Sequence, residues 1–125
     1  MDFVLWYQQE IEGKEFGIKA SEFEFKYRNS IEHFYPQNPN QDENHARLDE
    51  EYLTNFGNLC IMARRNNSLC SNLMPSAKIK EFSSTSQSLK FELMEKLAKN
   101  NDDWNGREII QHGTEMKKLL SEFIS

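Results

Sequence analysis

Apolar residues recur at helical spacing in four stretches of the chain. Phe3, Trp6, Tyr7 and Ile11 predict an amphipathic helix over about residues 2–12. Shorter helices are expected over 76–82 and over the stretch where leucines recur every four residues from Leu89. The last helix starts at Asn105, which with Glu108 forms a capping box, and extends almost to residue 125.

Two other stretches have the length and pattern of strands. Residues 30–34 form a short extended segment that Pro36 brings to an end, and residues 59–63 form a compact apolar run. A long polar loop over 36–47 and a short helix over 48–54 lie between them, and a further helix is expected to open at Asn67. The order strand, loop, strand, helix predicts a ββα unit over about residues 28–74. The alternation of Phe23, Phe25 and Tyr27 with charged residues is strand-like, with a short helix as the alternative.

Length and composition favour a single globular domain over residues 1–125. The chain is 38% hydrophobic and 12% aromatic, which is enough for one core. No apolar run approaches the roughly 18 residues of a membrane-spanning helix, and the N-terminus lacks a signal-peptide pattern, so we expect a cytoplasmic protein without membrane contact. The two cysteines do not form a Cys-x-x-Cys pair; Cys60 is expected in the core. His112 is expected to be structural, and Trp104 to be a core or interface residue.

The net charge of −5 is unusual for a protein that binds nucleic acid. Its distribution is uneven, because residues 58–90 carry five basic residues against one acidic residue, Glu81, a local charge of +4. The effect of surface charge is local at physiological salt, so a basic strip can bind phosphates on an acidic protein. The candidates for phosphate contacts are Arg64, Arg65, Lys78 and Lys80.

Glu32 and His33 stand side by side before Pro36, and Asn58 and Asn67 follow nine positions apart. A histidine is suited to general-base catalysis near neutral pH, and a carboxylate and an amide oxygen suit a hard divalent cation. We therefore predict His33 as the base and Glu32 and Asn67 as metal ligands. Asn58 is expected to hydrogen-bond across the turn and to fix His33 or the loop that carries it. Neighbouring strand residues point to opposite faces, so the strand is expected to bend at His33.

Three segments carry a resemblance to a known family. Glu32-His33-Phe34-Tyr35-Pro36-Gln37, Gly57-Asn58-Leu59 and Asn67-Ser68 resemble the C-terminal HNH (His-Me finger) domain of GmrSD-type, modification-dependent restriction endonucleases. The resemblance spans nearly the whole chain. Phe34 and Tyr35 replace the smaller aliphatic residues usual in the family.

The resemblance implies an α+β fold with a ββα-metal HNH core surrounded by several helices. It implies a metal-dependent endonuclease that hydrolyses DNA phosphodiester bonds, in restriction of foreign or modified DNA and hence antiviral defence. Mg²⁺ is the expected ion, with Mn²⁺ as the alternative. Full-length members carry an N-terminal nucleotide-dependent domain, so this chain is expected to be the C-terminal part of a larger protein. The competing hypothesis is a catalytically silent nucleic-acid-binding or protein-interaction domain that retains the fold.

Overall fold

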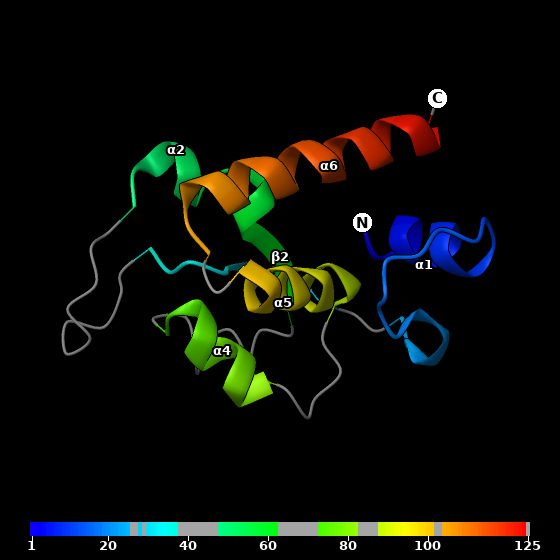
Figure 1. The fold of residues 1–125 in the computed structure, drawn as a ribbon, viewed down its shortest axis with the longest axis horizontal. Coiled ribbons are helices and arrows are strands. Elements are labelled where there is room, and N and C mark those ends of the chain that lie inside the picture. Colours follow the sequence, from blue (N-terminus) through cyan, green and yellow to red (C-terminus); the bar gives the residue numbers. More distant parts are fainter. Residues whose placement is uncertain are drawn as a thin grey trace.

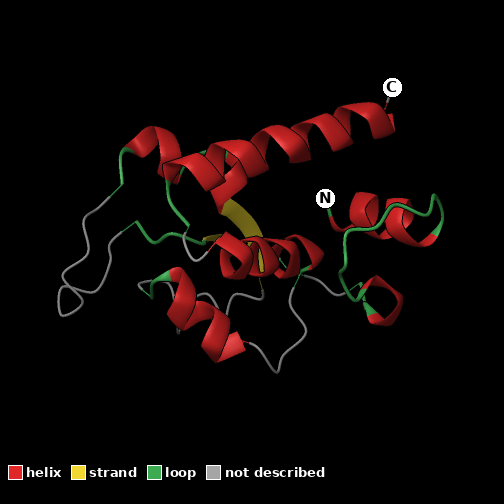
Figure 2. Ribbon diagram, in the orientation of Figure 1, coloured by secondary structure: helices red, strands yellow, loops and turns green. Residues whose placement is uncertain are grey.

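The computed structural model describes residues 1–25, 28, 30–37, 48–62, 73–82, 88–101 and 104–124. Within them the chain is a mixed α+β structure, with several helices around a two-stranded sheet (Figures 1 and 2). Its elements in chain order are α1 (Asp2–Glu10), η1 (Ala20–Glu22), β1 (Ser30–His33), α2 (Glu50–Leu53), η3 (Phe56–Asn58), β2 (Leu59–Met62), α4 (Pro75–Phe82), α5 (Leu89–Asn101) and α6 (Gly106–Ile124). The α+β class is confirmed.

The sheet is an antiparallel pair of β1 and β2, as the two strand-like stretches predicted. In its register Ile31 faces Ile61 and Glu32 faces Cys60. The side chains alternate across the sheet, so Ile31 and Ile61 are exposed whereas Glu32 and Cys60 are buried. This register turns an acidic side chain towards the core, which requires a partner there.

The helices α4, α5 and α6 bring apolar side chains to the inner face of the sheet. The main core cluster contains Phe34 from the end of β1, Met62 from β2, Phe91 from α5, and Trp104. The ring of Phe34 makes edge contacts with the rings of Phe91 and Trp104, at centroid distances of 5.6 and 5.0 Å. Phe34 is thus the aromatic centre of this core.

The short η3 helix lies directly against α6, and two glycines allow this approach. A Cβ added to Gly57 would lie 1.8 Å from the carbonyl oxygen of Ile109. A Cβ added to Gly113 would lie 2.3 Å from Oδ1 of Asn55. Since real Cβ atoms do not approach so closely, both positions need glycine, and the backbone before Asn58 is fixed against α6.

A second core cluster joins α1 to the long helices through residues such as Leu5, Leu93 and Met116. The carboxylate of Asp2 also accepts hydrogen bonds from the backbone N–H groups of Leu89, at 3.0 Å, and Lys90, at 3.4 Å. It therefore caps the start of α5 from a different helix, in the manner of an N-cap side chain. This contact fixes the first turn of α5.

Most predicted helix limits are close to the observed ones. The helix α1 ends at Glu10, two residues before the predicted end. The amide oxygen of Asn105 accepts from the N–H of Arg107 at 3.1 Å, which confirms Asn105 as the cap of α6. Residues 23–25 form no strand, while Tyr27 and the helix predicted to open at Asn67 lie outside the described residues. The third element of the predicted ββα unit is therefore untested. Among the described residues, no helix is both long enough and apolar enough to cross a membrane.

Candidate active site

The carboxylate of Glu32 forms an ion pair with Lys78 inside the protein. Glu32 is 1% exposed and Lys78 is completely buried. The ammonium group of Lys78 donates to Oε1 of Glu32 and to the carbonyl oxygens of His33 and, at 3.2 Å, Phe34. One side chain from α4 thus binds three consecutive residues at the end of β1. Burial raises the pKa of Glu32, and the neighbouring charge of Lys78 counteracts this effect.

This position corrects the expectation for Lys78. Contact with DNA phosphates requires a surface ammonium group, whereas Lys78 lies in the core because the buried carboxylate of Glu32 needs a cation. Lys80, two residues further along α4, is exposed as a phosphate contact requires. Arg64 and Arg65 lie outside the described residues.

His33 is the last residue of β1 and is partly exposed. The bend expected at His33 lies one residue later, at Phe34 and Tyr35, because His33 is still paired in β1. Burial, and to a lesser extent the charge of Lys78, lowers the pKa of His33. The charge of Glu50 raises the pKa and so counteracts part of this effect. A lowered pKa favours the neutral imidazole, which has a nitrogen that can accept a proton.

The side chain of Asn58, directly before β2, binds the loop that follows β1. Its Oδ1 accepts a hydrogen bond from the N–H of Tyr35 at 2.8 Å, and its Nδ2 donates to the carbonyl of Tyr35 at 3.0 Å. The same side chain donates to Leu53 O at 3.2 Å and accepts from Nε1 of Trp104 at 3.1 Å. Asn58 also accepts from the N–H of Phe34 through its own backbone carbonyl, at 2.9 Å. The expected contact across the turn is present, and it fixes the loop two residues after His33.

Two further residues position the site and were not singled out from the sequence. Trp104 was expected only as a core or interface residue, yet its indole N–H binds Asn58. Lys90 was counted only as a surface charge, yet its ammonium donates to the carbonyls of Phe56 and Leu59 on either side of Asn58. For Lys90 a signal was available, because Met94 follows it by one helical turn, which places Lys90 on the apolar side of the helix.

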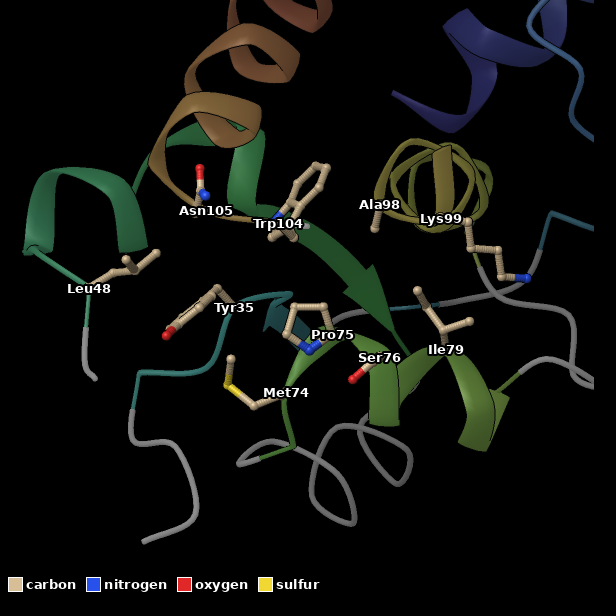
Figure 3. A pocket seen from close by; sticks show the side chains of 10 residues that line it. All are labelled: Tyr35, Leu48, Met74, Pro75, Ser76, Ile79, Ala98, Lys99, Trp104 and Asn105. Atoms are coloured by element: carbon tan, nitrogen blue, oxygen red, sulfur yellow. The ribbon is translucent and has the colours of Figure 1, made fainter. Parts of the chain in front are cut away.

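A cavity of about 560 Å³ adjoins this segment. Figure 3 shows it between α4 and the residues Trp104 and Asn105 that precede α6, with Tyr35 on one side and Ile79 on the other. Ser76 and Asn105 supply polar groups to a lining that is otherwise largely apolar. The lining comes from stretches far apart in the sequence, so local patterns gave no indication of it.

The second carboxylate oxygen of Glu32 is compatible with binding a divalent cation. Oε2 of Glu32 is buried, and it has no hydrogen-bond partner within the part of the chain that the structure describes. A carboxylate oxygen with unused lone pairs is a ligand that Mg²⁺ accepts. Asn67, the other expected ligand, lies outside the described residues. No cluster of three or more His, Cys, Asp or Glu suited to a metal occurs among the residues described.

Comparison with known proteins identifies the family. The model of the family described as "GmrSD restriction endonucleases, C-terminal domain" matches residues 2–119, which include Glu32, His33 and Asn58. No curated protein and no solved structure matches the chain. The match confirms the resemblance that the three sequence segments carry. The chain belongs to the family of C-terminal domains of GmrSD restriction endonucleases.

Proposed function

We propose that this domain is a metal-dependent endonuclease of the HNH type that hydrolyses DNA phosphodiester bonds. The observation that carries the proposal is the double hydrogen bond between Asn58 and the backbone of Tyr35. It fixes the segment directly after Glu32 and His33, the residues to which we assign the chemistry. The membership of the family of restriction endonuclease domains supports the same assignment.

In this proposal His33 is the general base. Its partly exposed imidazole accepts a proton from the water molecule that attacks phosphorus, and a neutral imidazole is required for that step. His33 ends β1 and is partly exposed, as access to a DNA strand requires. Asn58 binds the backbone of Phe34 and Tyr35 and so holds the chain directly after His33.

Glu32 and Asn67 would hold the divalent ion, with Mg²⁺ the expected metal and Mn²⁺ the alternative. When bound, such an ion stabilises charge on the phosphate and on the departing oxygen. For Glu32 the relevant atom is Oε2, since Oε1 is engaged by Lys78. Lys78 keeps the carboxylate in one orientation, because the same ammonium also binds the backbone of His33 and Phe34.

The DNA backbone would be bound by Arg64, Arg65 and Lys80. We further propose that the substrate is foreign or modified DNA in the cytoplasm, and that a nucleotide-dependent N-terminal domain of a larger protein directs the nuclease to it. The competing hypothesis of a silent binding domain retains some support, since the carboxylate of Glu32 is already neutralised by Lys78.

Plasmid DNA incubated with the purified protein tests the proposal. The wild type is expected to nick or cut the plasmid with Mg²⁺ and to stop when the metal is chelated. Asn67→Ala is expected to lose cleavage, whereas Lys80→Ala should weaken DNA binding in a salt-dependent manner. Absence of cleavage by the wild type at high protein concentration, with Mg²⁺ or Mn²⁺, would favour the silent domain.

A further inference from the structure

Lys90 lies in the interior close to the turn that carries Asn58. It is 3% exposed, and its Nζ donates to the carbonyl oxygens of Phe56, at 2.8 Å, and Leu59. Nζ also lies 3.6 Å from Sδ of Met94 and 4.7 Å from the centroid of the Phe56 ring. These contacts leave the ammonium group directed at the protein rather than at a substrate.

The two carbonyls that Lys90 binds belong to residues on opposite sides of Asn58. Phe56 begins η3, and Leu59 begins β2, so one ammonium group closes the turn between the two elements. Asn58, inside that turn, reaches in the other direction and binds Phe34 and Tyr35. Lys90 therefore holds the turn at 56–59, and Asn58 within that turn holds the loop after His33.

The position of Lys90 is itself fixed from outside its helix. Lys90 is the second residue of α5, and the carboxylate of Asp2 binds the N–H groups of Leu89 and Lys90. Burial lowers the pKa of Lys90 to about 8, so the side chain is still mainly protonated at neutral pH and keeps its full set of donors. A buried charge is costly unless it is hydrogen-bonded, and the carbonyls of Phe56 and Leu59 provide the acceptors here.

We propose that Lys90 is a positioning residue that holds Asn58, and through it the loop after His33, in the conformation needed for DNA cleavage. The catalytic consequence rests on the proposed function. The structural part does not, because the contacts of Lys90 and Asn58 can be measured without any substrate.

The test replaces the ammonium group with an uncharged side chain of similar length, in Lys90→Met. Lys96→Met is the matched control, because Lys96 lies on the same helix and also donates to a backbone carbonyl, that of Phe16 at 3.1 Å. The amides of Phe34 and Tyr35 both donate to Asn58. Their hydrogen-exchange rates, measured by NMR, report how often these two hydrogen bonds open. The amide of Ile11, bonded to Tyr7 at 2.8 Å at the end of α1, serves as the reference.

In Lys90→Met the exchange of Phe34 and Tyr35 is expected to accelerate by about tenfold or more relative to Ile11, equivalent to about 1.4 kcal/mol of local opening. The cleavage assay should show a lower kcat with KM unchanged, since Lys90 does not touch DNA. Lys96→Met should leave both readouts at wild-type values. If Lys90→Met does not fold, Lys90→Gln, which retains a shorter donor, is measured instead and should show a smaller acceleration.

Unchanged exchange at Phe34 and Tyr35 in the folded variant would overturn the proposal, even if the wild type cuts DNA. Accelerated exchange with an unchanged kcat would overturn its catalytic part. Accelerated exchange in a protein whose wild type does not cut DNA would support the positioning contact and contradict the proposed function alone.

Discussion

The side-chain amide of Asn58 binds both backbone groups of Tyr35, accepting from the N–H at 2.8 Å and donating to the carbonyl at 3.0 Å. An amide side chain can pair with a backbone amide in this way because it offers a donor and an acceptor side by side. The pairing replaces the strand-to-strand hydrogen bonds that end at His33. It therefore extends the order of the hairpin into the loop that follows the proposed base.

Replacing Asn58 with Ala should destabilise the protein and reduce cleavage together. The variant removes the Asn58 atoms that bind the N–H and carbonyl of Tyr35 and the indole N–H of Trp104. The expected loss of unfolding free energy is about 3 kcal/mol, measured by urea denaturation. Asn55→Ala, which removes a single side-chain bond to Gly57 N, should cost clearly less. Equal losses for the two variants would contradict the importance given to Asn58.

The ion pair between Glu32 and Lys78 should show strong coupling in a double-mutant cycle. Each single variant, Glu32→Gln or Lys78→Met, removes one partner of a pair whose side chains are at most 2% exposed, at an expected cost of about 3–5 kcal/mol. The double variant should cost less than the sum by about 1–3 kcal/mol. Lys99→Met, which breaks an exposed pair with Glu95, should change stability by under about 1 kcal/mol. Strict additivity would show that the two buried groups act independently.

Gly113→Ala should lower the melting temperature, although the same change inside an ordinary helix raises stability by about 1 kcal/mol. The added Cβ would lie 2.3 Å from Oδ1 of Asn55 and 2.9 Å from the backbone nitrogen of Gly57. Overpacking of this kind costs about 1–3 kcal/mol. Circular dichroism of Gly113→Ala and of Thr114→Ala, an exposed neighbour, provides the comparison. A higher melting temperature for Gly113→Ala would show that η3 does not pack closely on α6.

Stability should fall below pH 6.5 because of His112. Burial is the main cause that lowers its pKa to about 3, and the unfolded chain has the ordinary value of 6.5. The unfolded state therefore takes up a proton first as the pH falls, so the contribution is fully present above pH 6.5 and is lost progressively down to about pH 3. Between pH 7.5 and pH 5 the expected loss is about 2 kcal/mol.

Urea denaturation at the two pH values measures this loss, and His112→Leu is the comparison. The variant lacks the titrating group and should be less sensitive to pH by that amount. Identical pH dependence in the two proteins would show that His112 takes up its proton in the folded state as readily as in the unfolded chain.

The sequence indicated the elements of this fold because their patterns are local. Leucines four residues apart predicted α5, and the cap at Asn105 predicted the start of α6. An extended segment before Pro36 and a compact apolar run predicted the two strands. Even the contact of Asn58 with the loop after His33 followed from its place at the start of the second strand. The nearby Pro36 indicated where the first strand ends.

The buried lysines were not predicted because their partners lie far away along the chain. Lys78 pairs with Glu32 across 46 residues, and Lys90 binds carbonyls 31 and 34 residues before it. A single lysine is most often exposed, so both were counted towards a basic surface strip. Two of the five basic residues of that strip are instead internal. Whether such a lysine is buried or exposed depends on the tertiary packing.

Cleavage of DNA by wild type and His33→Gly, with and without added imidazole, tests the central claim most directly. With Mg²⁺ present, the variant should cut about 10²–10⁴-fold more slowly than the wild type. Free imidazole should restore part of the rate, since the glycine leaves space at a partly exposed position. Equal rates for wild type and His33→Gly, or no cleavage by either, would contradict the assignment of His33 as the base of a nuclease.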